Sequence, residues 1–144
     1  MNKELIAKHI EQIETALIVL EKYRETKAAD LERSLELRWT VERGLEVVMQ
    51  GVFDVAAHIL ASELKNDWDD YTTLLEKLGV YGVVPNEFAQ KFKTMAGFRN
   101  ILIHEYSQVD VRVVEKVLRE QLNSFHQFVG YIVNYMERQG GPAA

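Results

Sequence analysis

The chain has 144 residues, of which 47% are hydrophobic and 27% charged, a balance typical of a globular domain rather than of a disordered segment. It contains no cysteine, which excludes disulfides and thiolate metal sites. Its net charge of −5 argues against a broad RNA-binding surface, because proteins that hold nucleic acid mainly through phosphates usually present a basic face.

Apolar residues at helical spacing predict two long helices in the first half of the chain. A stripe from Ile6 to Leu20 indicates a first helix over residues 2–25, and a longer stripe indicates a second over 31–64. Asp30 is a plausible N-cap for the second helix. Gly44 and Gly51 lie inside this helix, where each costs up to ~1 kcal/mol relative to alanine, and they suggest close helix packing or a bend.

Three more helices are predicted in the second half. The polar stretch 66–70 precedes a short helix over 71–78 that Gly79 is expected to end. Gly82 and Pro85 mark a loop, and Asn86 is expected to cap a helix over 87–103. Residues 107–110 form the next break, and a last helix follows over 111–136.

No segment alternates apolar and polar residues as a half-buried strand does. We therefore predict an all-α, up-down bundle of four main helices plus one short helix, with a single domain over 1–138 and a flexible tail over 139–144. The acidic N-terminus does not resemble a secretory signal, and no apolar run approaches the ~20 residues that span a bilayer. A cytoplasmic protein without a membrane partner is the expectation.

The pattern R-N-x-x-x-H-x-Y, from Arg99 to Tyr106, is the most informative feature of the sequence. On a continuous helix, Arg99 and His104 would lie about 140° apart around the axis. His104 and Tyr106, two residues apart, would share a side only in an extended segment. If the helix unwinds near His104, the three side chains can converge. Asn100 is then placed to orient the arginine or the histidine by hydrogen bonding.

Such a set of residues suits RNA cleavage by transesterification, with no metal or other cofactor. Histidine can take the proton of a ribose 2′-OH or protonate the leaving 5′-oxygen. Arginine presents a charged planar fork to phosphate oxygens, where charge builds in the transition state. One histidine does not easily serve both sides of a phosphate, whereas two copies in a symmetric dimer could. By spacing alone, however, the helix dipole is the better explanation of an arginine and a histidine near a helix end.

Other candidate sites are weaker. No histidine follows a glutamate by three residues, as carboxylate-bridged metal sites in bundles require. Asp54 and His58 could form half of a metal site, but a buried hydrogen-bonded pair is the simpler interpretation. His9 and His126 are interpreted as packing or surface residues. The aromatic residues of the last helix are interpreted as core or dimer interface rather than a base-stacking platform. They are Phe125, Phe128, Tyr131 and Tyr135. Lys91, Lys93 and Arg99 could form a small basic lip beside the motif.

The stretch 95–106, which reads MAGFRNILIHEY, resembles the signature of the HEPN superfamily and specifically its HepT-like toxin branch, found in toxin–antitoxin systems of the MntA–HepT type. That branch carries Arg, a polar residue, three further residues, His, any residue and Tyr, and every defining position is filled here. The resemblance extends to the stretch 39–48 and to the segment 68–78, so it spans most of the chain.

The resemblance implies an all-α homodimer, or higher oligomer, whose Arg99 and His104 meet at the subunit interface in a metal-independent endoribonuclease site. Arg99 would bind phosphate, His104 would act as acid or base, and Asn100 would support them. It also implies that a nucleotidyltransferase antitoxin adds AMP units to Tyr106 and thereby neutralises the toxin. Each added phosphate would repel an RNA backbone two residues from His104. RNA is the implied substrate, and DNA is not expected.

Two alternatives remain open at this point. The chain could be a non-catalytic HEPN module that binds a nucleotidyltransferase and helps to present its substrate. It could also be a helical bundle used only for assembly, in which the motif is a coincidence. Growth arrest on expression of this chain alone would favour the toxin, and harmless expression would favour the module.

Overall fold

The structure is a computed structural model that describes residues 1–65, 67–103 and 109–139. These residues form eight helices and no strand, which confirms the all-α prediction for the described part of the chain. The helices are α1 (Lys3–Glu21), α2 (Ala28–Arg33), α3 (Leu35–Ser62), α4 (Tyr71–Val80), α5 (Asn86–Phe92), α6 (Met95–Ile103), α7 (Val111–Glu120) and α8 (Leu122–Gln139).

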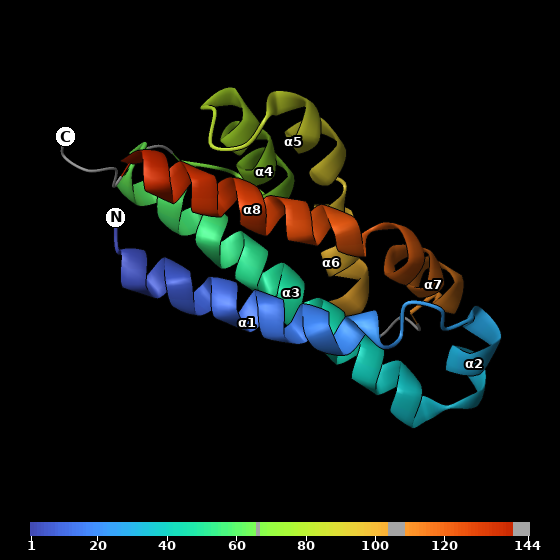
Figure 1. Cartoon of the computed structure of the whole chain (residues 1–144). Coiled ribbons are helices and arrows are strands. Elements are labelled where there is room, and N and C mark those ends of the chain that lie inside the picture. The colour runs from blue at the N-terminus through green and yellow to red at the C-terminus, as the bar shows by residue number, and fades with distance from the viewer. Residues whose placement is uncertain (66, 104–108, 140–144) are drawn as a thin grey trace.

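Three long helices form the body of the molecule. α1 runs in the opposite direction to α3 and α8, and the chain ends of α1 and α8 lie at the same end of the bundle (Figure 1). Close packing of α1 on α3 depends on two glycines of α3. A Cβ atom on Gly44 would lie 2.8 Å from Leu20 Cδ2, and one on Gly51 would lie 2.5 Å from Ile13 Cγ1. The two glycines thus serve close helix packing, one of the two roles that the sequence suggested.

α3 is the central element of the core. Its buried residues include Leu45, Phe53 and Ile59, and it packs against α1, α2, α4 and α6. By length and composition alone α3 could cross a membrane, which corrects the prediction that no segment is apolar enough. Over half of its most apolar window, 56%, is buried inside the bundle, as in the core helix of a globular protein. Its hydropathy is thus explained by packing within the fold.

The predicted helix 31–64 is wrong at its start. Ser34 has an extended backbone, with φ −125° and ψ 108°, and it divides α2 from α3. Its hydroxyl accepts a hydrogen bond from the Leu37 backbone N–H at 3.1 Å, so Ser34 is the N-cap of α3. Asp30 lies inside α2 instead, where its carboxylate accepts from the Lys27 N–H at 3.1 Å. Asp30 therefore helps to cap α2, a short helix that the apolar spacing did not separate from α3.

Two other predicted helices are also divided. The helix expected over 87–103 breaks after Lys93 into α5 and α6, and the helix expected over 111–136 breaks at Gln121 into α7 and α8. Neither break carries a glycine or a proline. Thr94 donates its hydroxyl hydrogen to the Lys91 carbonyl at 2.8 Å, which satisfies one of the carbonyls left at the end of α5. The chain thus has more and shorter helices than predicted.

Two expectations about the α4–α5 region need correction. Gly79 does not end α4, which continues to Val80; a Cβ there would lie 2.6 Å from Ala89 Cβ, so Gly79 allows α5 to approach. Asn86 is the first residue of α5 rather than its cap, and Pro85 occupies the N-cap position without a side-chain hydrogen bond. At the other end of the chain, α8 extends to Gln139, and the rest of the predicted tail lies outside the described residues.

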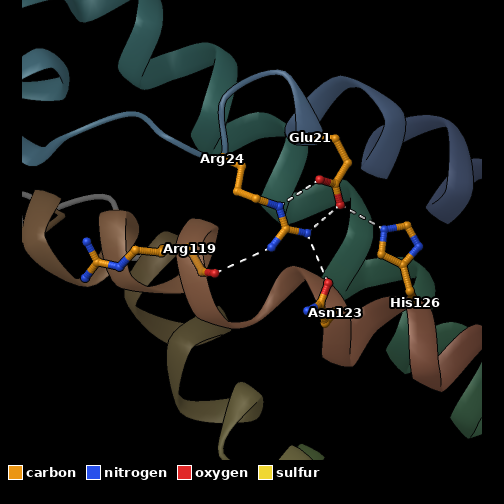
Figure 2. Close-up of polar contacts among 5 residues, drawn as sticks. All are labelled: Glu21, Arg24, Arg119, Asn123 and His126. Carbon is orange, nitrogen blue, oxygen red and sulfur yellow. Dashed lines mark hydrogen bonds and ion pairs between the residues drawn. The ribbon is translucent and has the colours of Figure 1, made fainter.

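A polar cluster fastens the end of α1 to the α7–α8 junction (Figure 2). Arg24 forms a bidentate pair with Glu21, through Nε at 2.8 Å and Nη2 at 2.7 Å. It also donates to Asn123 Oδ1 at 3.1 Å and to the Arg119 carbonyl oxygen at 3.5 Å. His126 Nε2 lies 3.0 Å from Glu21 Oε1. The cluster holds α7, the helix that follows residues 104–108, against the rest of the bundle.

Candidate functional site

The first residue of the motif, Arg99, lies on α6. Met95, Ala96 and Phe98 are buried and fix this helix in the core, where α6 packs against α3 and α4. Arg99 follows directly on this anchored turn and is itself half-buried. The burial of its neighbours therefore determines where its side chain begins, and α3 and α4 supply the residues that it meets.

The Arg99 guanidinium contacts one polar and two aromatic side chains. Nη2 donates a hydrogen bond to Gln50 Oε1 of α3 at 3.2 Å. The guanidinium carbon lies 4.5 Å from the ring centroid of Tyr71 and 5.8 Å from that of Phe53. The two rings are stacked on each other with centroids 4.3 Å apart. A guanidinium over aromatic faces keeps its full charge and gains cation–π attraction.

The polar contacts continue from Arg99 along α3 to α1. Gln50 Nε2 donates to Asp54 Oδ1 at 2.9 Å, one helical turn further along α3. The other carboxylate oxygen of Asp54 lies 4.0 Å from His9 Nδ1 on α1. Gln50 and Asp54 also line an open groove of about 560 Å³ between α1 and α3. Gln50 thus connects the motif arginine to this groove, and Asp54 continues the row of polar side chains to His9.

The remaining motif residues divide into two groups. Asn100 is exposed on α6, beside Arg99, and its supporting role stays a prediction. His104 and Tyr106 lie outside the described residues, as does the predicted unwinding of the helix at His104. The helix is described up to Ile103, the residue before the histidine, and the chain is described again from Val109. Asp110 then caps α7 by accepting from the Arg112 N–H at 2.9 Å.

Residues 7–132 match the model of a family described as ribonuclease HepT-like, which is most of the chain. The chain belongs to the HepT-like ribonuclease family. A tRNA nuclease HepT from Aphanizomenon flos-aquae is 29% identical over 134 residues, which cover 92% of this chain and 90% of the relative. An mRNA nuclease HepT from Shewanella oneidensis is 23% identical over 108 residues, which cover 72% of this chain and 78% of the relative.

Solved structures share the fold of this HepT-like chain. A tri-AMPylated Shewanella oneidensis HEPN toxin in complex with MNT antitoxin superposes with a TM-score of 0.80. The superposition covers 93% of this chain and 99% of that chain, at 21% sequence identity. At that identity the likeness establishes the HEPN fold, and the resemblance inferred from residues 95–106 is confirmed at the level of the family.

The sequence did not reveal the neighbours of Arg99 in this HepT-like chain, which are Gln50, Phe53 and Tyr71, nor Asp54 beyond Gln50. The sequence suggests Asp54 only as a partner of His58, four residues later. Instead His58 Nε2 accepts a hydrogen bond from the Asn2 backbone N–H at 3.1 Å, and Asp54 faces Gln50 and His9. The i,i+4 spacing of Gln50 and Asp54 was the available signal, but spacing does not say which tertiary neighbour a polar pair meets.

The other candidates from the sequence have structural explanations. Phe125, Phe128 and Tyr135 are buried in the core, and Tyr131 packs edge-on against Phe88 with centroids 4.9 Å apart. The prediction of a basic lip is wrong for Lys93, because its ammonium forms an ion pair with Glu76 at 2.9 Å. Among the described residues, no group of three or more His, Asp or Glu side chains is arranged to hold a metal ion.

Proposed function

We propose that this chain is the toxin of a toxin–antitoxin pair and that it cleaves RNA at a site built from Arg99 and His104. The observation that carries the proposal is the placement of Arg99 on the anchored helix α6, which runs to Ile103, the residue before His104. Its guanidinium rests on aromatic rings and on a neutral amide, so its positive charge is available to a phosphate. Membership of the HepT-like ribonuclease family supports the same activity.

In the proposed reaction, His104 removes the proton from a ribose 2′-OH, and the resulting oxygen attacks the adjacent phosphorus. The bond from phosphorus to the 5′-oxygen breaks, and a proton delivered to that oxygen completes its departure. Arg99 stabilises the charge that accumulates on the non-bridging phosphate oxygens. The products are a 2′,3′-cyclic phosphate and a 5′-hydroxyl end. Asn100 supports the orientation of these two side chains.

The site is proposed to be shared between two subunits of a homodimer. A reaction that needs both a base and an acid is served better by two histidines, one from each copy, than by one. Sharing also fits the net charge of −5, since two copies can concentrate two motif arginines at one place without a broadly basic surface.

Neutralisation is proposed to occur by AMPylation of Tyr106 by a partner nucleotidyltransferase. Transfer of an adenylyl group from ATP to the tyrosine oxygen forms a phosphodiester and releases pyrophosphate. The modification places at least one negative charge and a bulky nucleoside two residues from His104, where both oppose the approach of an RNA backbone. The related HEPN toxin in complex with MNT antitoxin is tri-AMPylated, which supports this form of control.

The test of the proposed activity is RNA cleavage by the purified chain in the presence of EDTA. We expect fragments with 2′,3′-cyclic phosphate ends, and we expect Arg99→Ala and His104→Ala each to reduce cleavage by at least ~100-fold, the scale of a lost acid–base group or charge stabiliser. The active species is expected at twice the chain mass of 16.6 kDa by light scattering.

Two results would contradict the proposal. If both variants remain as active and as toxic as the parent, the site assignment is wrong. If expression of the parent chain alone is harmless and no RNA is cleaved, the chain is a non-catalytic binding module instead.

A further inference from the structure

Two kinds of contact fix the Arg99 guanidinium, and they restrain different motions. The faces of Tyr71 and Phe53 restrain its tilt, because the guanidinium carbon lies over both rings. Stacking alone leaves the fork free to rotate in its own plane. The hydrogen bond from Nη2 to Gln50 Oε1 removes that freedom. Arg99 Nε is buried without a partner among the described residues, so Gln50 makes the described hydrogen bond that sets the direction of the fork.

Asp54 determines which end of the Gln50 amide faces the arginine. A glutamine amide has one oxygen, which accepts, and one NH2 group, which donates. The Asp54 carboxylate accepts from Gln50 Nε2 at 2.9 Å, and this interaction occupies the donor end of the amide. The amide oxygen therefore points to Arg99, where a donor end would repel the guanidinium. The order carboxylate, amide, guanidinium is the one arrangement of these groups that satisfies each contact.

This arrangement holds the arginine without neutralising it. A carboxylate in direct contact with Arg99 would hold it firmly, but it would also cancel the charge that a phosphate needs and compete for the same fork. The neutral amide keeps the Asp54 charge one side chain away. The groove beyond it is lined by Glu11, Glu46 and Asp54 with Arg43, so the charged side chains at the far end of this chain of contacts are mostly acidic.

We infer that Gln50 is a positioning residue that orients Arg99 for the scissile phosphate while leaving its charge uncompensated, with Asp54 fixing the direction of the amide. This inference rests on the proposed function, because it assigns Gln50 to the same site. A residue that merely supported the fold at this place could be replaced by any side chain that holds Arg99 equally well. The two roles therefore predict different outcomes for one isosteric substitution.

The decisive substitution is Gln50→Glu, which retains the shape and replaces the amide by a carboxylate. A glutamate here would pair with Arg99 and cancel its charge, and it would also place a second carboxylate beside Asp54, because Gln50 Nε2 lies 2.9 Å from Asp54 Oδ1. We expect kcat for RNA cleavage to fall roughly 10- to 100-fold, the effect of one charged hydrogen bond. Affinity for a 2′-O-methyl RNA, which cannot be cleaved, should weaken in parallel, and circular dichroism should show the helix content of the parent even though repulsion between the new carboxylate and Asp54 lowers the urea midpoint.

The matched control is Gln12→Glu, which adds the same charge to the same groove from an exposed position on α1. It should leave cleavage and binding unchanged. A second variant, Gln50→Leu, removes the acceptor without adding charge. It should lower kcat because no acceptor orients the Arg99 guanidinium. If this variant is less stable, RNA affinity is measured on its folded fraction, where it still reports on Arg99.

The outcomes separate this inference from the proposed function. If the parent cleaves RNA, Arg99→Ala does not, and Gln50→Glu cleaves at the parental rate, Gln50 is structural and only this inference falls. If Gln12→Glu lowers activity as much as Gln50→Glu, the effect is one of general groove charge and the inference also falls. If the parent neither cleaves nor binds RNA, the proposed function and this inference are both overturned.

Discussion

The described side chains that contact the Arg99 guanidinium attract a cation and carry no formal charge. Tyr71 and Phe53 offer their ring faces, and Gln50 offers an amide oxygen. These contacts restrict the side chain before any ligand arrives, so less conformational entropy is lost when it binds. Preorganisation of this kind is what electrostatic stabilisation of a transition state requires, since the donor is already oriented when charge develops.

Tyr106 carries the prediction about control at the residue scale. Incubation with the partner nucleotidyltransferase and ATP should increase the intact mass of the chain by whole AMP units and abolish RNA cleavage, because the added phosphates repel the substrate. Tyr106→Phe should remain unmodified. The control is Tyr81→Phe, at an exposed tyrosine directly after α4, which should be modified like the parent. Modification of the Tyr106→Phe chain at another tyrosine would refute the assignment.

At the scale of the helices, the main packing contact of the bundle is the one between α1 and α3. The contact is close because α3 presents glycine where α1 presents the branched side chains of Leu20 and Ile13. The loss of helix propensity at each glycine is offset by the dispersion contacts that close approach provides. Gly130 of α8 is different, because a Cβ atom there would meet nothing within 4 Å.

Substitution of these glycines by alanine should have opposite effects. Gly51→Ala should destabilise the fold by about 1–3 kcal/mol, because its Cβ would overlap Ile13 Cγ1, an atom that cannot move without displacing the rest of that buried side chain. Gly130→Ala should stabilise it by about 0.5–1 kcal/mol through helix propensity alone. Urea denaturation of both variants measures the difference. A stabilising Gly51→Ala would show that the two helices do not approach as closely as described.

At the scale of the whole molecule, polar interactions join elements that are distant in sequence. The cluster around Glu21 and Arg24 links the end of α1 to α7 and α8, and Glu115 of α7 accepts a hydrogen bond from the backbone N–H of Ala28 in α2. Together these contacts fix both sides of the α7 helix. In the sequence, α7 follows the motif closely, because only Val109 and Asp110 separate it from residues 104–108.

Acid should weaken this linkage. The hydrogen bonds from Arg24 and then His126 lower the pKa of Glu21 to about 2, from an unperturbed value of 4.5. Because the pKa is lower in the folded state, the stabilisation is complete above about pH 4.5 and is lost as the pH falls from there toward 2. The side chain is 37% exposed, so solvent screening limits the contribution to about 0.2–1 kcal/mol.

The measurement is urea unfolding of the parent and of Glu21→Gln at pH 7 and at pH 3. The variant should be less stable at pH 7, and the difference should shrink at pH 3. Glu32→Gln, an exposed glutamate on α2, is the control and should show little change at either pH. An equal deficit of Glu21→Gln at both values would mean that the carboxylate charge is not the stabilising feature.

The sequence by itself determined the helical class, the family and the motif. Apolar spacing identifies where helices run, because a buried stripe must recur with the helical period in any bundle. It also indicated close helix packing or a bend at Gly44 and Gly51, and the structure shows close packing at both. The R-N-x-x-x-H-x-Y pattern from Arg99 to Tyr106 identified the family because every defining residue of the family signature is present in the same order and at the same spacing.

Only the tertiary structure decided where the helices break and what Arg99 meets. A one-residue break at Ser34 or Gln121 leaves the apolar stripe on both sides nearly in phase, so periodicity passes through it. Gln50 and Tyr71 lie 49 and 28 positions from Arg99, and no local rule connects them. Their convergence follows from the packing of α6 between α3 and α4. The motif identifies Arg99 as a site residue, but helix packing places uncharged side chains against its guanidinium, and these leave its charge available to a phosphate.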